Sequence, residues 1–195
     1  MYFFIGSDDF KIKTLIIKLV YEWNNKTENL IGRPAIQKLC YFAEAIDVPM
    51  GYKFSVYKYG PYSQDLFDHI DDMVVYGLLT DDSKKKNNKE SVSSYSITDV
   101  AEELLISYKD FVSTYDDKLC YIVDYFKDMS LRDLELFSSI HYYHTANNGY
   151  YRGIDKNKLK ELTINNIIKA KKDRFKQNEI DSAYFQLEGA SLAFS

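Results

Sequence analysis

The chain has 195 residues, of which 46% are apolar and 28% are charged, and its formal net charge is −4 at pH 7. This length is sufficient for one domain, or for a small domain with an extension. The acidic balance argues against broad, charge-driven binding to nucleic acid, because phosphate contacts require an excess of Lys and Arg.

The start of the chain does not resemble an export signal. The apolar residues 2–5 are followed at once by Asp8 and Asp9, without a basic start or a long apolar run. No segment approaches the roughly 20 apolar residues of a membrane span, so we expect a soluble, cytoplasmic protein. Cys40 and Cys120 lie within apolar helical patterns and are expected to be buried free thiols, neither a disulfide nor a metal site.

Two amphipathic helices are expected first. Apolar side chains recur at helical spacing over residues 9–24, which predicts the first helix. The second begins near Pro34, because a proline in the first turn of a helix has no N–H that needs a partner. Its apolar face continues to Ile46, and Pro49 and Gly51 end it.

A strand and a third helix follow. The aromatic, partly alternating run 53–59 predicts a strand, and Gly60 and Pro61 are expected to break it. Ser63 is a good N-cap for a helix over residues 63–78, since its hydroxyl can accept a hydrogen bond from a free backbone N–H.

The next segment has the outline of a wing. Residues 81–91 are polar and rich in Lys, which indicates a hairpin tip between a strand near residue 80 and a returning strand over 92–97. Asp99 and Glu102 have capping-box spacing and open another helix. The order of helix, helix, hairpin and helix is that of a winged helix-turn-helix, which we assign to residues 1–98.

The second half, residues 99–195, is expected to be a helical extension packed on the first. An apolar stripe starting at Asp99 continues to Phe126 with a break near Ser113, and Ser130 caps the next helix. Residues 155–177 predict a last, basic helix. The predicted fold class is therefore α+β, mostly α: a winged helix-turn-helix with a helical C-terminal extension.

Short motifs in the first half resemble those of a known family. They are Gly32-Arg33, Leu39 after Gln37-Lys38, Tyr41, Gly51, Tyr59-Gly60-Pro61-Tyr62-Ser63 and Gly77-Leu78-Leu79. Together they resemble the YwgA family of small prokaryotic proteins, over residues 30–80. A looser resemblance is to the Panacea antitoxin-like domain, which has a similar Lys-Leu-x-Tyr-Phe helix and a Tyr-Gly-Pro motif. The Panacea resemblance implies neutralisation of a toxin by protein contact, and neither resemblance carries over a catalytic residue.

The turn at Gly60 also indicates a candidate binding surface for a protein partner. Tyrosine is favoured at interfaces, and carboxylates on the third helix would steer a basic partner. The candidate partner-binding residues are Tyr57, Tyr59, Tyr62, Asp65, Asp68 and Asp72. The structural alternative is that these rings belong to the core and the turn only sets the angle at which the helix begins.

DNA binding is the first alternative. The third helix exposes carboxylates and no Lys or Arg, so its insertion into a groove is disfavoured. DNA would instead meet the wing and the last helix, at Lys84, Lys85, Lys86, Lys89, Lys171, Lys172 and Arg174. The competing interpretation is a solvated hairpin tip and a solvated helix face.

No catalytic residues, cofactor or metal ligands are expected. The sequence shows no nucleophile beside a base, no paired carboxylates in an apolar setting and no phosphate-binding glycine loop. His141 and His144 have i, i+3 spacing, but no third ligand has a matching motif. We therefore expect a non-catalytic interaction protein, antitoxin-like or regulatory, with a homodimer as a further option. The alternatives are a sequence-specific DNA-binding transcriptional regulator and an uncharacterised enzyme.

Overall fold

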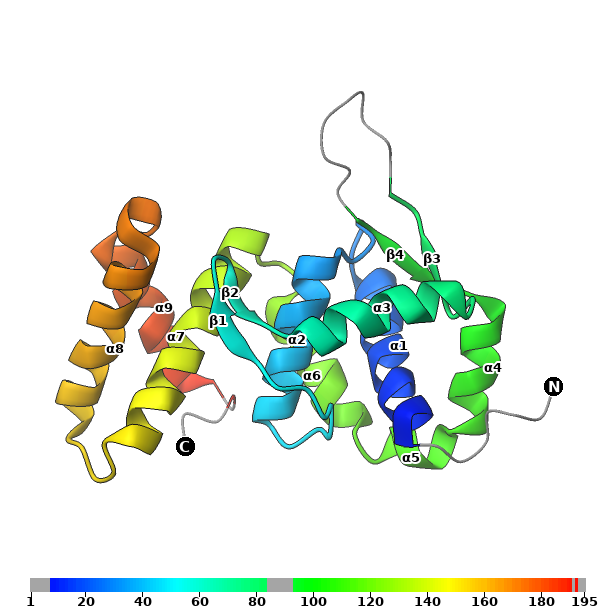
Figure 1. Ribbon diagram of the computed structural model, residues 1–195, viewed down its shortest axis with the longest axis horizontal. Coiled ribbons are helices and arrows are strands. Elements are labelled where there is room, and N and C mark those ends of the chain that lie inside the picture. The colour runs from blue at the N-terminus through cyan, green and yellow to red at the C-terminus, as the bar shows by residue number, and fades with distance from the viewer. Residues whose placement is uncertain (1–7, 84–92, 191, 193–195) are drawn as a thin grey trace. The chain divides into compact units, whose positions relative to one another are not determined.

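The computed structural model describes residues 8–83, 93–190 and 192, which form helices and two small antiparallel sheets (Figure 1). The elements of the first part of the chain are α1 (Asp8–Lys26), α2 (Arg33–Ala45), β1 (Ser55–Tyr57), β2 (Gly60–Tyr62), α3 (Gln64–Val75), β3 (Leu79–Asp81) and β4 (Tyr95–Ile97). They are followed by α4 (Asp99–Ser107), α5 (Lys109–Ser113), α6 (Asp116–Phe126), α7 (Leu131–Tyr150), α8 (Lys156–Lys171), the 3-10 helix η1 (Lys172–Arg174) and α9 (Gln177–Gly189). The expectation of a mostly helical α+β chain is confirmed.

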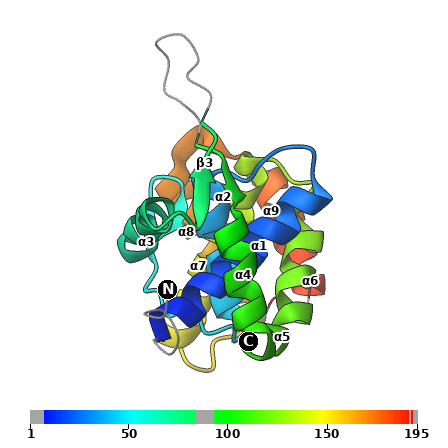
Figure 2. The ribbon, with the colours of Figure 1, turned by 90° about the vertical axis from the view of Figure 1, so that its right-hand side faces the viewer.

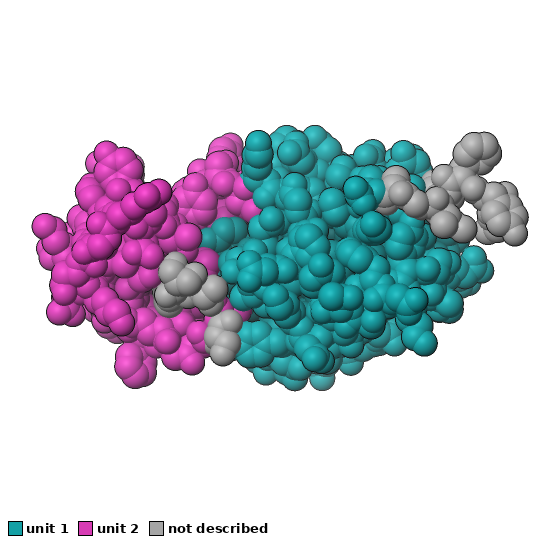
Figure 3. All heavy atoms as spheres, turned by 90° about the horizontal axis from the view of Figure 1, so that it is seen from below, with its two compact units in different colours: residues 1–53, 63–128 teal, residues 54–62, 129–195 magenta. Residues whose placement is uncertain are grey.

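The chain forms two compact units (Figure 3). The first unit comprises Met1–Lys53 and Ser63–Asp128, and the second comprises Phe54–Tyr62 and Met129–Ser195. These boundaries differ from the division at residue 98 that the sequence suggested. Helices α4, α5 and α6 contact α1 or α2 in the first unit, and the hairpin β1–β2 contacts α7 in the second.

The core of the first unit is built around α1, which contacts α2, α4, α5, α6 and β4 (Figure 2). Its apolar stripe is completely buried, at Leu15, Ile16, Ile17, Leu19 and Val20. The rings of Phe42 on α2 and Phe126 on α6 stack with their centroids 4.5 Å apart. Burial of such side chains stabilises the unit by about 1.5–3 kcal/mol for each residue. Cys40 is likewise buried as a free thiol, whereas the free thiol of Cys120 is half-buried.

The predicted order of helix, hairpin and helix is confirmed in the first unit. The Ser63 hydroxyl caps α3 by accepting from the backbone N–H of Leu66, 3.4 Å away. Gly77, at φ 67°, ends the following turn, and β3 and β4 pair antiparallel from Leu79↔Ile97 to Asp81↔Tyr95. The Thr98 hydroxyl caps α4 by accepting from the backbone N–H of Ala101, 3.3 Å away. The winged helix-turn-helix assignment itself stays a prediction.

Two sequence-based expectations in the second unit are wrong. Gly60 and Pro61 do not simply break a strand but form β2, which returns antiparallel to β1. Residues 155–177 are not one helix, because α8 ends at Lys171 and the backbone of Lys172 takes a positive φ of 48°. The chain then passes through η1 into α9, and both α8 and α9 pack on α7.

Across the residues that the structure describes, no helix is both long enough and apolar enough to cross a membrane.

Candidate partner-binding surface

The tyrosine hairpin, which we define as residues 55–62, carries all three candidate tyrosines. β1 and β2 pair in the register Ser55↔Tyr62, Val56↔Pro61 and Tyr57↔Gly60, so Lys58 and Tyr59 form the turn. Gly60 has a φ of 93°, a conformation that glycine adopts without steric cost. The sequence thus builds a tight two-residue turn with large side chains on it.

The three rings differ in exposure. Tyr57 is 68% exposed and Tyr59 is 49% exposed, whereas Tyr62 is half-buried and lies with its ring centroid 5.8 Å from that of Tyr57. An exposed phenol combines apolar contact area with a polar tip, a combination common in protein interfaces. Tyr57 and Tyr59 are therefore available to a partner, and Tyr62 supports Tyr57 from the side.

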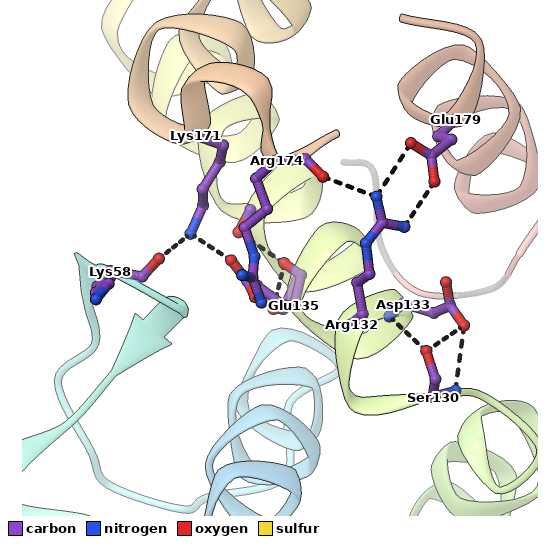
Figure 4. Close-up of polar contacts among 10 residues, drawn as sticks. Lys58, Ser130, Arg132, Asp133, Glu135, Lys171, Arg174 and Glu179 are labelled. Atoms are coloured by element: carbon purple, nitrogen blue, oxygen red, sulfur yellow. Dashed lines mark hydrogen bonds and ion pairs between the residues drawn. The ribbon is translucent and has the colours of Figure 1, made fainter. Parts of the chain in front are cut away.

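The turn of the tyrosine hairpin is held by a buried lysine. Lys171, the last residue of α8, donates a hydrogen bond of 2.7 Å from Nζ to the carbonyl oxygen of Lys58. The same ammonium lies 3.1 Å from Oε1 of Glu135 on α7, and the two side chains are only 3% and 4% exposed. Figure 4 shows the ammonium pointing between these two oxygens.

Arg174, whose side chain is 42% exposed, completes this ion group from the surface. Its Nε donates to Oε2 of Glu135 over 2.8 Å, and its Nη2 lies 2.6 Å from the same oxygen. Its guanidinium also lies over the ring of Tyr59, 5.2 Å from the centroid. Glu135 therefore joins η1 and the end of α8 to α7, and Arg174 links that junction to the exposed turn.

Burial sets the electrostatics of the ion group. Desolvation lowers the pKa of Lys171, while the Glu135 carboxylate acts in the opposite direction. A buried ion pair offsets its desolvation cost only with good geometry and additional hydrogen bonds, and here the Lys58 carbonyl supplies one of them. The position of the turn and the pairing of Lys171 are thus linked.

A second ion pair braces the same region from α9. The guanidinium of Arg132 on α7 lies 2.6 Å from Oε1 of Glu179 and donates over 2.7 Å to the carbonyl oxygen of Arg174 (Figure 4). The bond from Arg132 and one from the backbone of Lys176 lower the pKa of Glu179 to about 2. The segment that carries Arg174 is therefore fixed on both sides.

The acidic candidates lie in the other unit. Asp65, Asp68 and Asp72 are exposed on α3, and Oδ1 of Asp68 accepts from the side chain of Gln64 over 2.8 Å. The predicted six-residue patch thus divides into three tyrosines of the second unit and three carboxylates of the first unit.

The basic candidates of the predicted last helix were expected to contact DNA or to lie on a solvated helix face, and two of them are engaged within the second unit. Lys171 is buried and bonded, and the guanidinium of Arg174 is bound to Glu135. Lys172 is exposed in η1. The wing lysines, at positions 84, 85, 86 and 89, lie outside the described residues.

Sequence reasoning missed Glu135 and Lys58. Glu135 is flanked directly by Leu134 and Leu136 in α7, which is the signal that could have identified it. A carboxylate on an apolar face requires a cationic or hydrogen-bonding partner.

The two histidines on α7 have structural partners. A ring nitrogen of His141 lies 2.8 Å from the carbonyl oxygen of Leu192, and one of His144 lies 2.8 Å from the Tyr184 hydroxyl. In the described parts of the chain, no three His, Cys, Asp or Glu side chains are grouped to hold a metal ion.

Comparison with known proteins gives one informative similarity. No protein-family model matches the chain. The chain is 28% identical over 159 residues to the uncharacterised protein YwgA of Bacillus subtilis (strain 168), which covers 82% of this chain and 86% of that protein. This distant similarity supports a YwgA-like relationship that extends well beyond the motifs of residues 30–80. It bears on the YwgA resemblance alone and not on the Panacea resemblance.

Proposed function

We propose that this chain is a non-catalytic interaction protein, antitoxin-like or regulatory, that binds a protein partner through the tyrosine hairpin. The observation that carries the proposal is the display of Tyr57 and Tyr59 on a turn anchored by buried Lys171. Holding contact residues in a fixed position reduces the entropy that association costs. The carboxylates of α3 are a second candidate contact surface. We interpret α3, the hairpin β3–β4 and α4 of the first unit as a winged helix.

The DNA-binding alternative has less support. Lys171 and Arg174 are engaged by Glu135, so of its three candidates in the second unit only Lys172 is an exposed cation with no ion pair to another described residue. Each phosphate contact needs a cation that can release counterions. The wing lysines carry the rest of this alternative.

Site-specific photo-crosslinking tests the proposal. A benzophenone amino acid replaces Tyr57 in the full chain, and the matched control carries it at Tyr150, which is 80% exposed on α7 of the same unit. We expect a protein adduct from the native lysate that forms at position 57, survives nuclease treatment and re-forms from the purified components. A nuclease-sensitive adduct, or equal adducts at both positions, would contradict a protein-binding tyrosine hairpin.

A further inference from the structure

The outer edge of β1 has an unpaired backbone position. Among the described residues β1 pairs with β2 alone, and Val56 lies opposite Pro61. Proline has no N–H, so this pair cannot exchange the two hydrogen bonds of a hydrogen-bonded antiparallel pair. The N–H and C=O of Val56 therefore point away from β2, toward the open edge of the sheet.

The side chains along this edge are exposed. Ser55 and Tyr57 flank Val56 on β1 and both face solvent, while Pro61 on β2 is buried and β2 contacts α7. One edge of the hairpin is thus held by the body of the second unit, and the other presents unpaired backbone groups. An exposed edge with a free N–H and C=O is a template for a further strand.

The charge around the edge is positive. Residues 54–62 contain Lys58 and no carboxylate, and the Lys58 ammonium lies 5.2 Å from the centroid of the Tyr59 ring. In the adjoining segment 172–176, Lys172 and Lys176 are exposed cations beside one exposed carboxylate, Asp173, and Arg174 is paired with Glu135. Glu135 offsets one of the two positive charges of Lys171 and Arg174, so this ion group keeps one net positive charge.

We propose that the open edge of β1 takes up an extended, acidic segment of the partner protein as an added antiparallel or parallel strand. This proposal rests on the proposed function and specifies the chemistry of the partner. The backbone of Val56 supplies main-chain hydrogen bonds, which give affinity in strand addition. Tyr57 supplies apolar contact, and Lys58 selects carboxylates by charge complementarity.

Selection from a displayed library of random 12-residue peptides, with the full chain as bait, tests this proposal. We expect the selected peptides to be enriched in Asp and Glu and to lack proline at their centre. Val56→Pro removes the outward N–H without removing a hydrogen bond of the hairpin. It should lower the affinity for the best selected peptide by about tenfold or more. The matched control Val56→Thr keeps the N–H and should bind within about twofold of the original chain.

Two further measurements make the test independent of the folding of one variant. N-methylation of alternate backbone positions in the selected peptide should weaken its binding to the unaltered chain by about tenfold. Lys58→Glu should weaken it too, and the loss should shrink as salt is added.

Other outcomes overturn the strand-addition proposal. One is that no peptide is selected, or that the selected peptides are basic or neutral. Another is that peptide binding is unchanged by both Val56→Pro and N-methylation. The last is that a 20-residue oligothymidylate displaces the peptide at equal concentration. If crosslinking at position 57 still yields a protein adduct in any of these cases, the proposed function stands and strand addition is wrong. If crosslinking fails as well, both are wrong.

Discussion

Lys171 and Lys58 are 113 residues apart in the chain and are joined by a hydrogen bond of 2.7 Å from the Lys171 ammonium to the Lys58 carbonyl oxygen. The donor is a buried cation paired with Glu135, and the acceptor lies in the turn that displays Tyr57 and Tyr59. A buried ion therefore determines where an exposed turn sits.

Replacing this cation tests that linkage. Lys171→Met should lower the free energy of unfolding by about 2–4 kcal/mol, because Glu135 loses one of its two cationic partners and the turn loses its anchor. The matched control is Lys169→Met, a change at an exposed position of the same helix that should stay within about 0.5 kcal/mol of the original chain. Chemical denaturation measures both. Equal midpoints for the two variants would show that the buried ion group does not stabilise the unit.

The Gly32-Arg33 motif has a structural role in the first unit. A Cβ on residue 32 would lie 2.9 Å from the backbone oxygen of Ser93. The Arg33 guanidinium lies 4.0 Å from the centroid of the Phe67 ring and donates from Nε to the Tyr95 hydroxyl over 2.9 Å. It also donates from Nη1 to the Phe67 carbonyl over 3.2 Å. The motif thus connects α2, α3 and β4.

Arg33→Lys should destabilise the first unit by about 1–2 kcal/mol, since an ammonium cannot stack on Phe67 and reach the same set of acceptors. Lys26→Arg, a charge-conserving change at a surface ion pair, serves as the control. Thermal unfolding followed by circular dichroism distinguishes the two. If Arg33→Lys melts at the temperature of the original chain, the motif is retained for a reason other than this network.

Much of the fold follows from local signals. Apolar periodicity located α1 and α3, and Ser63 marked the start of α3 because a serine hydroxyl can satisfy a free N–H there. The break after α8 had no such signal, since neither Gly nor Pro stands near Lys172. β2 was missed because Pro61 was taken as a strand breaker, yet proline is tolerated where no ladder hydrogen bond is required.

The candidate surface was less accessible to sequence reasoning. Repeated tyrosines around a turn identified the tyrosine hairpin, but whether each ring is exposed depends on what packs behind it. Lys171 was expected either to contact DNA or to lie on a solvated helix face. Its actual partners, Glu135 and the Lys58 carbonyl, come from distant segments. Pairing across such separations is a property of tertiary structure, and composition alone does not reveal it.

Glu44 should make the protein slightly more stable when it cannot ionise. Burial raises the pKa of Glu44, although the backbone N–H groups of Gly51 and Tyr52 act in the opposite direction. Its Oε2 is buried and has no hydrogen-bond partner among the residues that the structure describes. The folded state therefore binds the proton of the Glu44 carboxyl more tightly than the unfolded state does. The favourable contribution of the protonated carboxyl to the free energy of unfolding is present at low pH and is lost as the pH rises.

Glu44→Gln should therefore raise Tm at pH 7 by up to about 3 °C and have a smaller effect at pH 4. Glu28→Gln, at an exposed position, is the control for the loss of one negative charge. Thermal melts of the three proteins at both pH values measure the effect. A gain for Glu44→Gln that is equal at pH 4 and pH 7 would disprove the assignment to ionisation.

His144 should contribute to acid sensitivity in the second unit. Burial, and to a smaller extent nearby His141, lowers the pKa of His144 to about 4. Between pH 6.5 and pH 4 the unfolded chain therefore binds a proton at this histidine that the folded chain does not. Neutral His144 therefore contributes about 1–2 kcal/mol to the free energy of unfolding at pH values above this window. This contribution is lost as the pH falls through the window.

NMR titration of the folded protein should show the His144 ring neutral down to about pH 4. The variant His144→Gln keeps a side chain that can hydrogen-bond to Tyr184, so its loss of stability between pH 6.5 and pH 4 should be smaller than that of the original chain. Parallel pH dependences for the two proteins would mean that other groups account for the acid sensitivity.

The exposures of Tyr57 and Tyr62 separate a binding role from a core role. Tyr57 is 68% exposed, so Tyr57→Ala should change the free energy of unfolding by less than about 0.5 kcal/mol. Tyr62 on β2 is half-buried, and its ring lies beside that of Tyr57 on β1. Tyr62→Ala should lower the free energy of unfolding by about 1–2 kcal/mol, because removal of the ring exposes apolar surface beneath the strand. Urea denaturation measures both values, and the benzophenone adduct at position 59 measures partner contact in each variant.

We expect Tyr57→Ala to suppress the adduct while the protein stays fully folded. If Tyr57→Ala instead destabilises the protein as much as Tyr62→Ala does, Tyr57 is a packing residue and the tyrosine hairpin is not the binding surface.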